Sequence, residues 1–75
     1  MKREILLDAR DLLPPEPMER VMLVLDRLQP GEHVRFLVSR EPVPLYPILH
    51  QKGYRFQTHL MSGQTYEVLI YPKES

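Results

Sequence analysis

The chain has 75 residues, and its ten basic side chains balance its ten acidic ones, so the formal net charge is zero with neutral histidines. A chain of this length corresponds to one domain, so residues 1–75 are expected to fold as a single unit. The balanced charge argues against a broad cationic surface for nucleic acid. The sequence contains no cysteine, which excludes disulfides, thiolate metal sites and thiol catalysis.

No apolar run approaches the ~20 residues of a membrane helix. The N-terminal stretch "MKREILLDARD" is charged and lacks the apolar centre of a signal peptide. We therefore expect a cytoplasmic protein without a membrane segment.

The first third of the chain predicts a strand, a proline-rich loop and a helix. The short apolar run Glu4–Asp8 is typical of a buried strand. From Pro17 to Leu28 apolar residues recur at spacings of three and four, which predicts an amphipathic helix. Pro17 suits the first helical turn, where a missing N–H costs nothing, and Gly31 can end the segment with a positive φ.

The rest of the chain predicts a strand, a short helix and a hairpin. Residues 33–39 alternate between apolar and polar, and residues 44–52 form one apolar helical face that stops at Gly53. Two further alternating segments, 54–60 and 65–71, flank the turn "MSGQ" and predict a hairpin. The residues predicted to face the helices from these strands are Val34, Phe36, Val38, Tyr54, Phe56, Thr58, Leu60, Tyr66, Val68 and Ile70.

The resulting order β-α-β-α-β-β predicts an α/β (α+β) two-layer sandwich. Helix-bridged strands run parallel with right-handed crossovers, so a four-stranded mixed sheet should carry both helices on one face. Phe36 is expected at the centre of the core. Leu25, Leu49, Phe56 and Val68 should surround it.

The stretch "LDARDLLPPEP", Leu7 to Pro17, together with this element order, resembles the TusA/SirA-like family of small sulfur carriers. That family has the pattern Leu-Asp-x-x-Gly-x-x-Cys-Pro-x-Pro between the first strand and the first helix. Leu7, Asp8, Pro15 and Pro17 match it, Asp11 stands at the glycine and Pro14 at the sulfur-carrying cysteine. The resemblance implies a cysteine-free, largely uncharacterised side branch, in which "REPVPLYP" from Arg40 to Pro47 is also a signature. Sulfur transfer does not carry over, because proline offers no nucleophile.

Two strand-to-helix loops supply the candidate site. Each is stiffened by prolines, each carries an arginine beside an acid, and parallel pairing should bring both to the same sheet edge. Two helix N-termini there favour an anion. The predicted ligand- or partner-binding residues are Arg10, Asp11, Pro14, Pro15, Glu16, Arg40 and Glu41. Two alternatives stay open: Arg40 and Glu41 pair with Asp11 and Arg10, and the prolines only restrict the unfolded chain.

The open sheet face is a second candidate surface. Leu37, Leu69 and Tyr71 are predicted on it, where a cluster would form a contact site or a homodimer interface. Arg35 and Arg55 share the face, which keeps RNA binding as a rival interpretation. The histidines His33, His50 and His59 are predicted as solvated side chains without a metal. No serine–histidine–acid spacing or glycine-rich phosphate loop occurs, so neither a catalytic residue nor a cofactor is predicted.

The sequence therefore favours a non-catalytic binding or regulatory module that holds a protein or small anionic partner at the strand-end loops. The first alternative is an accessory protein of sulfur or redox metabolism, acting with a partner that supplies the reactive group. The second is an RNA-binding module.

Overall fold

The computed structural model describes residues 3–73 and has the element order β-α-β-α-β-β that the sequence predicts. The elements are β1 (Arg3–Asp8), α1 (Glu16–Asp26), β2 (Glu32–Val38), α2 (Leu45–Gln51), β3 (Arg55–Met61), the short 3-10 turn η1 (Ser62–Gln64) and β4 (Thr65–Tyr71). The predicted bounds agree to within one or two residues, since capping and fraying shift helix ends by about that much.

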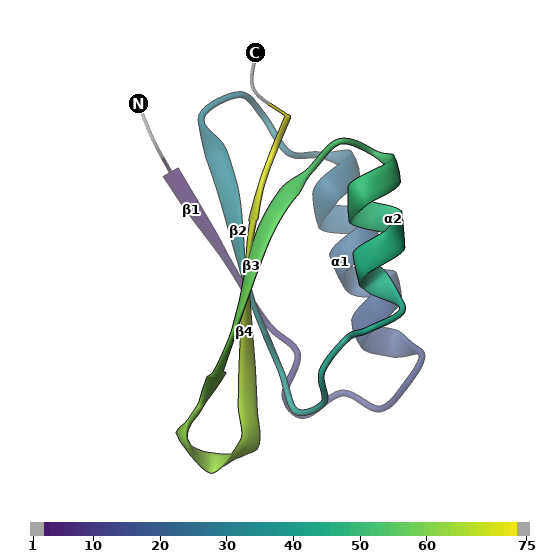
Figure 1. Ribbon diagram of the computed structural model, residues 1–75, viewed down its shortest axis with the longest axis vertical. Coiled ribbons are helices and arrows are strands. Elements are labelled where there is room, and N and C mark those ends of the chain that lie inside the picture. Colours follow the sequence, from purple (N-terminus) through teal and green to yellow (C-terminus); the bar gives the residue numbers. More distant parts are fainter. Residues whose placement is uncertain (1–2, 74–75) are drawn as a thin grey trace.

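The four strands form one mixed sheet in the order β1-β2-β4-β3. β1 runs parallel to β2, while β4 is antiparallel to both β2 and β3. Both helices cover the same side of this sheet, and its other side stays open (Figure 1). The two-layer sandwich is thus confirmed, with β4 placed between the parallel strands β2 and β3.

The core lies between the sheet and the two helices. Phe36 at the middle of β2 is 0% exposed and stands opposite Val68 of β4 in the register. Leu25 of α1 and Leu49 of α2 are also buried, and Phe56 of β3 packs against this cluster. The core predicted from the alternation is confirmed, and burying each large apolar side chain contributes about 1.5–3 kcal/mol.

Leu60 is a correction to the predicted core. It follows Phe56 and Thr58 on the helix-facing side of β3, yet its side chain is 65% exposed. The β3–β4 hairpin extends away from the helices at this end, so no second layer covers it (Figure 1). Alternation identifies which side of a strand a residue faces, but not whether the opposite layer reaches it.

Leu37 is a correction to the predicted open face. It lies there in register between Asp8 of β1 and Glu67 of β4, yet it is only 7% exposed. Tyr71, at the other end of this face, stacks on His33 with the ring centroids 5.1 Å apart. Leu37 therefore adds little exposed apolar area to the open face, while Leu69 and Tyr71 remain partly exposed there.

Proline and glycine determine where the helices begin and end. Pro17 is buried in the first turn of α1, as predicted, and the preceding loop contains a cis peptide bond between Pro14 and Pro15. Gly31 and Gly53 follow the helices with φ values of 85° and 84°, a left-handed conformation that other residues rarely adopt. Neither helix within residues 3–73 has the length and apolar character needed to cross a membrane.

Candidate functional site

The loops that follow β1 and β2 lie side by side, as the parallel pairing predicts. We call this region, residues 9–15 and 39–44 with the adjacent η1 turn, the loop edge. The backbone N–H of Ala9 donates to the carbonyl of Leu37 at 2.8 Å, which extends the ladder by one residue. The Ser39 hydroxyl then donates to the carbonyl of Arg10 at 2.6 Å. These bonds join the two loops into one surface at the end of the sheet.

Arg10 binds Asp8, the last residue of β1, so the alternative in which Arg10 pairs with Glu41 is wrong. Its Nε and Nη2 donate to the two carboxylate oxygens of Asp8 at 2.9 and 2.6 Å. These side-chain hydrogen bonds, with a further one from the Arg10 backbone N–H, lower the pKa of Asp8 from 3.8 to about 2. The carboxylate in turn raises the pKa of Arg10. The bidentate pair occupies the guanidinium, and a ligand must compete with it.

Two of the three acids of the candidate site, Glu16 and Glu41, are also engaged locally. Glu16, the first residue of α1, pairs with Arg20 one turn along the helix at 3.1 Å. Glu41 accepts a hydrogen bond from the Tyr46 hydroxyl at 3.1 Å, and the same hydroxyl lies 2.7 Å from Thr58 of β3. Burial raises the pKa of Tyr46, and the Glu41 carboxylate adds to the rise. Both acids therefore anchor structure and do not neutralise the arginines.

Arg40 differs from Arg10 because it has no ion pair with any residue between 3 and 73. The same holds for Asp11 in this range, so the predicted Arg40–Asp11 pairing is also wrong. Arg40 borders a hollow of about 390 Å³. Its lining residues are Ser39, Arg40, Glu41, Leu60, Gln64 and Tyr66. The loop edge thus offers one available guanidinium beside a shallow depression.

Exposed apolar side chains gather at this end of the molecule. Among residues 3–73, four of the six large hydrophobic side chains that remain exposed belong to the loop edge or to the end of β3 beside it. They are Leu13 (78% exposed), Val43 (55%), Leu60 (65%) and Met61 (39%). Pro14 and Pro15 are exposed next to Leu13. Scattered apolar residues are normal on a surface, but several at one end of a molecule can mark a contact site. Of these side chains, Leu60 lines the hollow together with Arg40.

Sequence reasoning found Arg40 and the two prolines but missed Leu60, Gln64 and Tyr66. These three come from the β3–β4 hairpin, about 20 or more positions further along the chain than Arg40, and alternation placed Leu60 and Tyr66 on the helix-facing side of their strands. For Gln64 the sequence contains one hint of an unusual backbone conformation, because the residue directly follows Gly63 in the predicted turn. Its φ of 61° places it in the left-handed region.

The loop edge offers a guanidinium, backbone groups and apolar side chains as possible contacts. The Ser39 hydroxyl donates to a backbone carbonyl, so it has no base partner among its recorded contacts. His33 and His59 bond to Glu4 and Glu67 on the open sheet face, away from this edge. Across residues 3–73, no three His, Asp or Glu side chains come together as metal ligands.

The chain matches one family model, described as "Uncharacterized conserved protein (DUF2249)", over residues 6–72. The match includes the proline loop, both helices and the hairpin. No curated protein and no solved structure matches the chain.

Proposed function

The chain belongs to the DUF2249 family, and we propose that it is a non-catalytic binding module whose loop edge holds a protein partner. In this proposal the Arg40 guanidinium grips a carboxylate of the partner, while exposed apolar side chains around it pack against the partner's surface. The observation that carries the proposal is the available Arg40 beside the hollow, within the main group of exposed hydrophobic side chains.

The energetics favour a protein over a small anion. A single exposed ion pair contributes only about 0–1 kcal/mol, which is too little to hold a small anion from solution. Removing apolar area from water contributes about 25 cal/mol per Å², and a partner that covers Leu13, Val43 and Leu60 can draw on that term. Arginine is enriched at the centres of protein interfaces, where its fork of donors matches a carboxylate.

Rigidity of the loops also supports binding. Ser39 fastens the second loop to the first, and Glu41 is tied through Tyr46 to β3. The loops carry Pro14, Pro15 and Pro42, whose φ angles are restricted. A surface that is already ordered loses less conformational entropy on association.

We further propose that the chain is related by descent to the TusA/SirA-like sulfur carriers and that its loop edge corresponds to their sulfur-carrying loop. The support is the element order together with the residues of "LDARDLLPPEP" that match the sulfur-carrier pattern. Pro14 stands at the cysteine position, so the chain has no thiol to hold a persulfide. On this view the loop retains a partner-facing role without the sulfur, which also suits an accessory protein of sulfur or redox metabolism.

The test is affinity capture from lysate of the native cell, with the wild type, Arg40→Gln and Arg55→Gln as immobilised baits. Arg55 is the matched control, because it is an exposed arginine without an ion pair in residues 3–73 at the far end of the sheet. We expect Arg40→Gln to weaken capture of one protein by roughly tenfold or more, while Arg55→Gln captures as the wild type does. All three baits should melt at the same temperature.

A charge swap completes the test. Arg40→Glu should abolish capture, and replacing one acidic residue of the captured protein with arginine should restore it. If capture survives Arg40→Glu but is lost in Leu69→Asp, the binding surface is the open sheet face and the proposal is wrong.

A further inference from the structure

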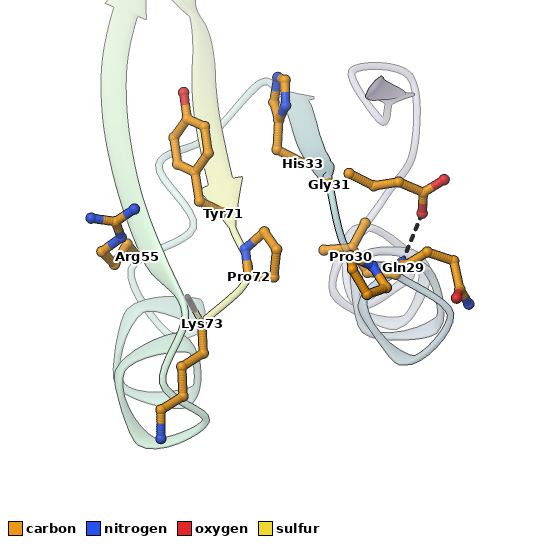
Figure 2. Close-up of a pocket in the computed structure, with 10 residues that line it drawn as sticks. Gln29, Pro30, Gly31, His33, Arg55, Tyr71, Pro72 and Lys73 are labelled. Atoms are coloured by element: carbon orange, nitrogen blue, oxygen red, sulfur yellow. Dashed lines mark hydrogen bonds between the residues drawn. The ribbon is translucent and has the colours of Figure 1, made fainter. Parts of the chain in front are cut away.

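A second cavity, of about 500 Å³, lies at the end of the sheet opposite the loop edge. We call it the distal groove. It is bounded on one side by the turn Gln29–Gly31 between α1 and β2, and on the other by the chain that leaves β4 at Pro72 and Lys73 (Figure 2). Its volume falls within the ~300–1,000 Å³ of small-molecule sites.

Flat ring surfaces line the distal groove. His33 of β2 and Tyr71 of β4 stack with an interplanar angle of 25°, and Nε2 of His33 lies 3.2 Å from the Glu4 carboxylate. These contacts hold both rings in place on neighbouring strands. The rings of Pro30 and Pro72 lie on the two sides below them (Figure 2). Such ring surfaces favour a planar partner that can stack on them.

The charge available in the distal groove is positive. Arg55 stands opposite Tyr71 in the β3–β4 register, and Lys73 follows two residues later. Within residues 3–73 neither cation forms an ion pair. The groove's own acid, Glu32, is already engaged, because its carboxylate accepts the backbone N–H of Gln29 at 2.8 Å and lies 3.7 Å from Arg3.

Lys73 is placed beside the groove by a close backbone contact. Its aliphatic chain runs over Gly53, where an added Cβ would lie 3.2 Å from the lysine Cδ. The absence of a side chain at Gly53 therefore makes room for Lys73 on the same side of the groove as Arg55 (Figure 2).

We propose that the distal groove binds a small aromatic anion, whose ring packs on the Tyr71 side of the groove and whose anionic group is held by Arg55. Lys73 forms the wall of the groove over Gly53 and adds positive charge there, while its ammonium end points away from Arg55 (Figure 2). The shared chemistry is a flat aromatic ring joined to an anionic group. In nucleoside monophosphates the two are joined through the ribose, and in aromatic carboxylates they are joined directly. The site is independent of the loop edge, and neither proposal requires the other.

The experiment is an NMR titration of the ¹⁵N-labelled chain with two complete probes, adenosine 5′-monophosphate and 4-hydroxybenzoate. Adenosine and ribose 5-phosphate serve as the separate halves of the first probe. We expect saturable shifts of the backbone amides of residues 29, 31–33, 71 and 73 with at least one complete probe. Each half should bind that site about tenfold or more weakly than the whole. Which complete probe binds identifies the source of the ligand.

Variants separate the ring contact from the charge contact. Arg55→Gln should reduce the affinity of the bound probe about tenfold, and Tyr71→Leu should do the same. Arg40→Gln, at the loop edge, should leave it unchanged. If the NMR spectrum of Tyr71→Leu shows that this variant is unfolded, the test rests on Arg55→Gln alone. The Arg55 side chain is exposed, so its replacement should not disturb the fold. The proposal is overturned if neither complete probe gives saturable shifts, if inorganic phosphate reproduces them, or if Arg55→Gln binds as the wild type does.

Discussion

The two ends of the sheet both carry a pair of cations, but the loop edge keeps one of them available and the distal groove keeps two. At the loop edge Arg10 lies two residues from Asp8, and the bidentate pair occupies it. At the distal groove the nearest acid, Glu32, accepts a backbone N–H from the turn before it. Pairing with a close neighbour along the chain orders few residues and costs little entropy. Whether an acid lies close to a cation along the chain thus determines whether that cation is paired or remains available for a ligand.

The two ends also differ in their uncharged neighbours. The exposed Leu60 lines the hollow beside Arg40, and Leu13 and Val43 are exposed in the two loops at the same end, whereas Arg55 lies beside the stacked rings of Tyr71 and His33. Aliphatic surface without a deep cavity suits a protein, and ring surfaces around a larger cavity suit a small planar ligand.

Phe36→Ala should have the largest effect, because both ends depend on the same core. Removing this fully buried ring costs about 3–5 kcal/mol of the free energy of unfolding, a large share of the stability of a small domain. Urea denaturation followed by circular dichroism should show this loss of stability as a lower transition midpoint. Leu23→Ala, on an exposed position of α1, is the control and should change stability by less than ~0.5 kcal/mol. Equal stability of the two variants would show that the inward face of β2 is misassigned.

Gly53→Ala and Gly63→Ala compare the two ends directly. Both glycines have positive φ, 84° and 72°, so an alanine at either should cost about 1–2 kcal/mol. Only at Gly53 does the new methyl meet a neighbour, the Lys73 side chain, which must then move. Thermal melts should therefore fall similarly, while only Gly53→Ala weakens the probe that binds the distal groove. A comparable loss of probe binding in Gly63→Ala would remove the assigned role of Lys73.

Tyr46→Phe should loosen the loop edge alone. It deletes the hydroxyl that bonds Glu41 and Thr58 while the stacking on Phe56, with centroids 5.0 Å apart, is kept. Losing these bonds should cost about 1 kcal/mol, measured by urea denaturation. Tyr66→Phe is the control, since its hydroxyl has no hydrogen bond recorded within residues 3–73. If the two variants lose equal stability, the Tyr46 hydroxyl does not anchor this loop.

The smallest expected effect is the titration of Asp8. Because its pKa in the folded chain is about 2 and its ordinary value is 3.8, the Asp8–Arg10 pair stabilises the fold above about pH 4. That contribution is lost as the pH falls from 3.8 towards 2. Carboxyl NMR should give an Asp8 pKa near 2 in the wild type and in Arg40→Gln. In Arg10→Gln the Asp8 pKa should rise but stay below 3.8, because the backbone N–H of residue 10 still donates to the carboxylate. An Asp8 pKa near 3.8 in the wild type would mean that Arg10 is also available, and the contrast between the two ends would disappear.

Much of the fold followed from local patterns. The helical spacing around Val21 and Leu25, the alternation around Phe36 and the glycines after both helices were enough for the element order and the core. These patterns suffice because each element buries one face. The residues of that face are three or four positions apart in a helix and two positions apart in a strand. The shared sheet edge of the two loops followed from parallel pairing alone.

The tertiary structure decided how far each layer extends and which groups meet across the chain. Leu60 lies on the helix-facing side of β3 but is 65% exposed, because the hairpin extends past the helices (Figure 1). Leu37 lies on the open face between Asp8 and Glu67 but is only 7% exposed. Periodicity describes one element at a time and contains no information about the reach of another layer. Lys73 and Arg55 border one groove only because β3 and β4 pair and Gly53 leaves space beside them. The sequence by itself thus determined the elements and the core, whereas the availability of Arg40, Arg55 and Lys73 depended on distances that only the packed fold defines.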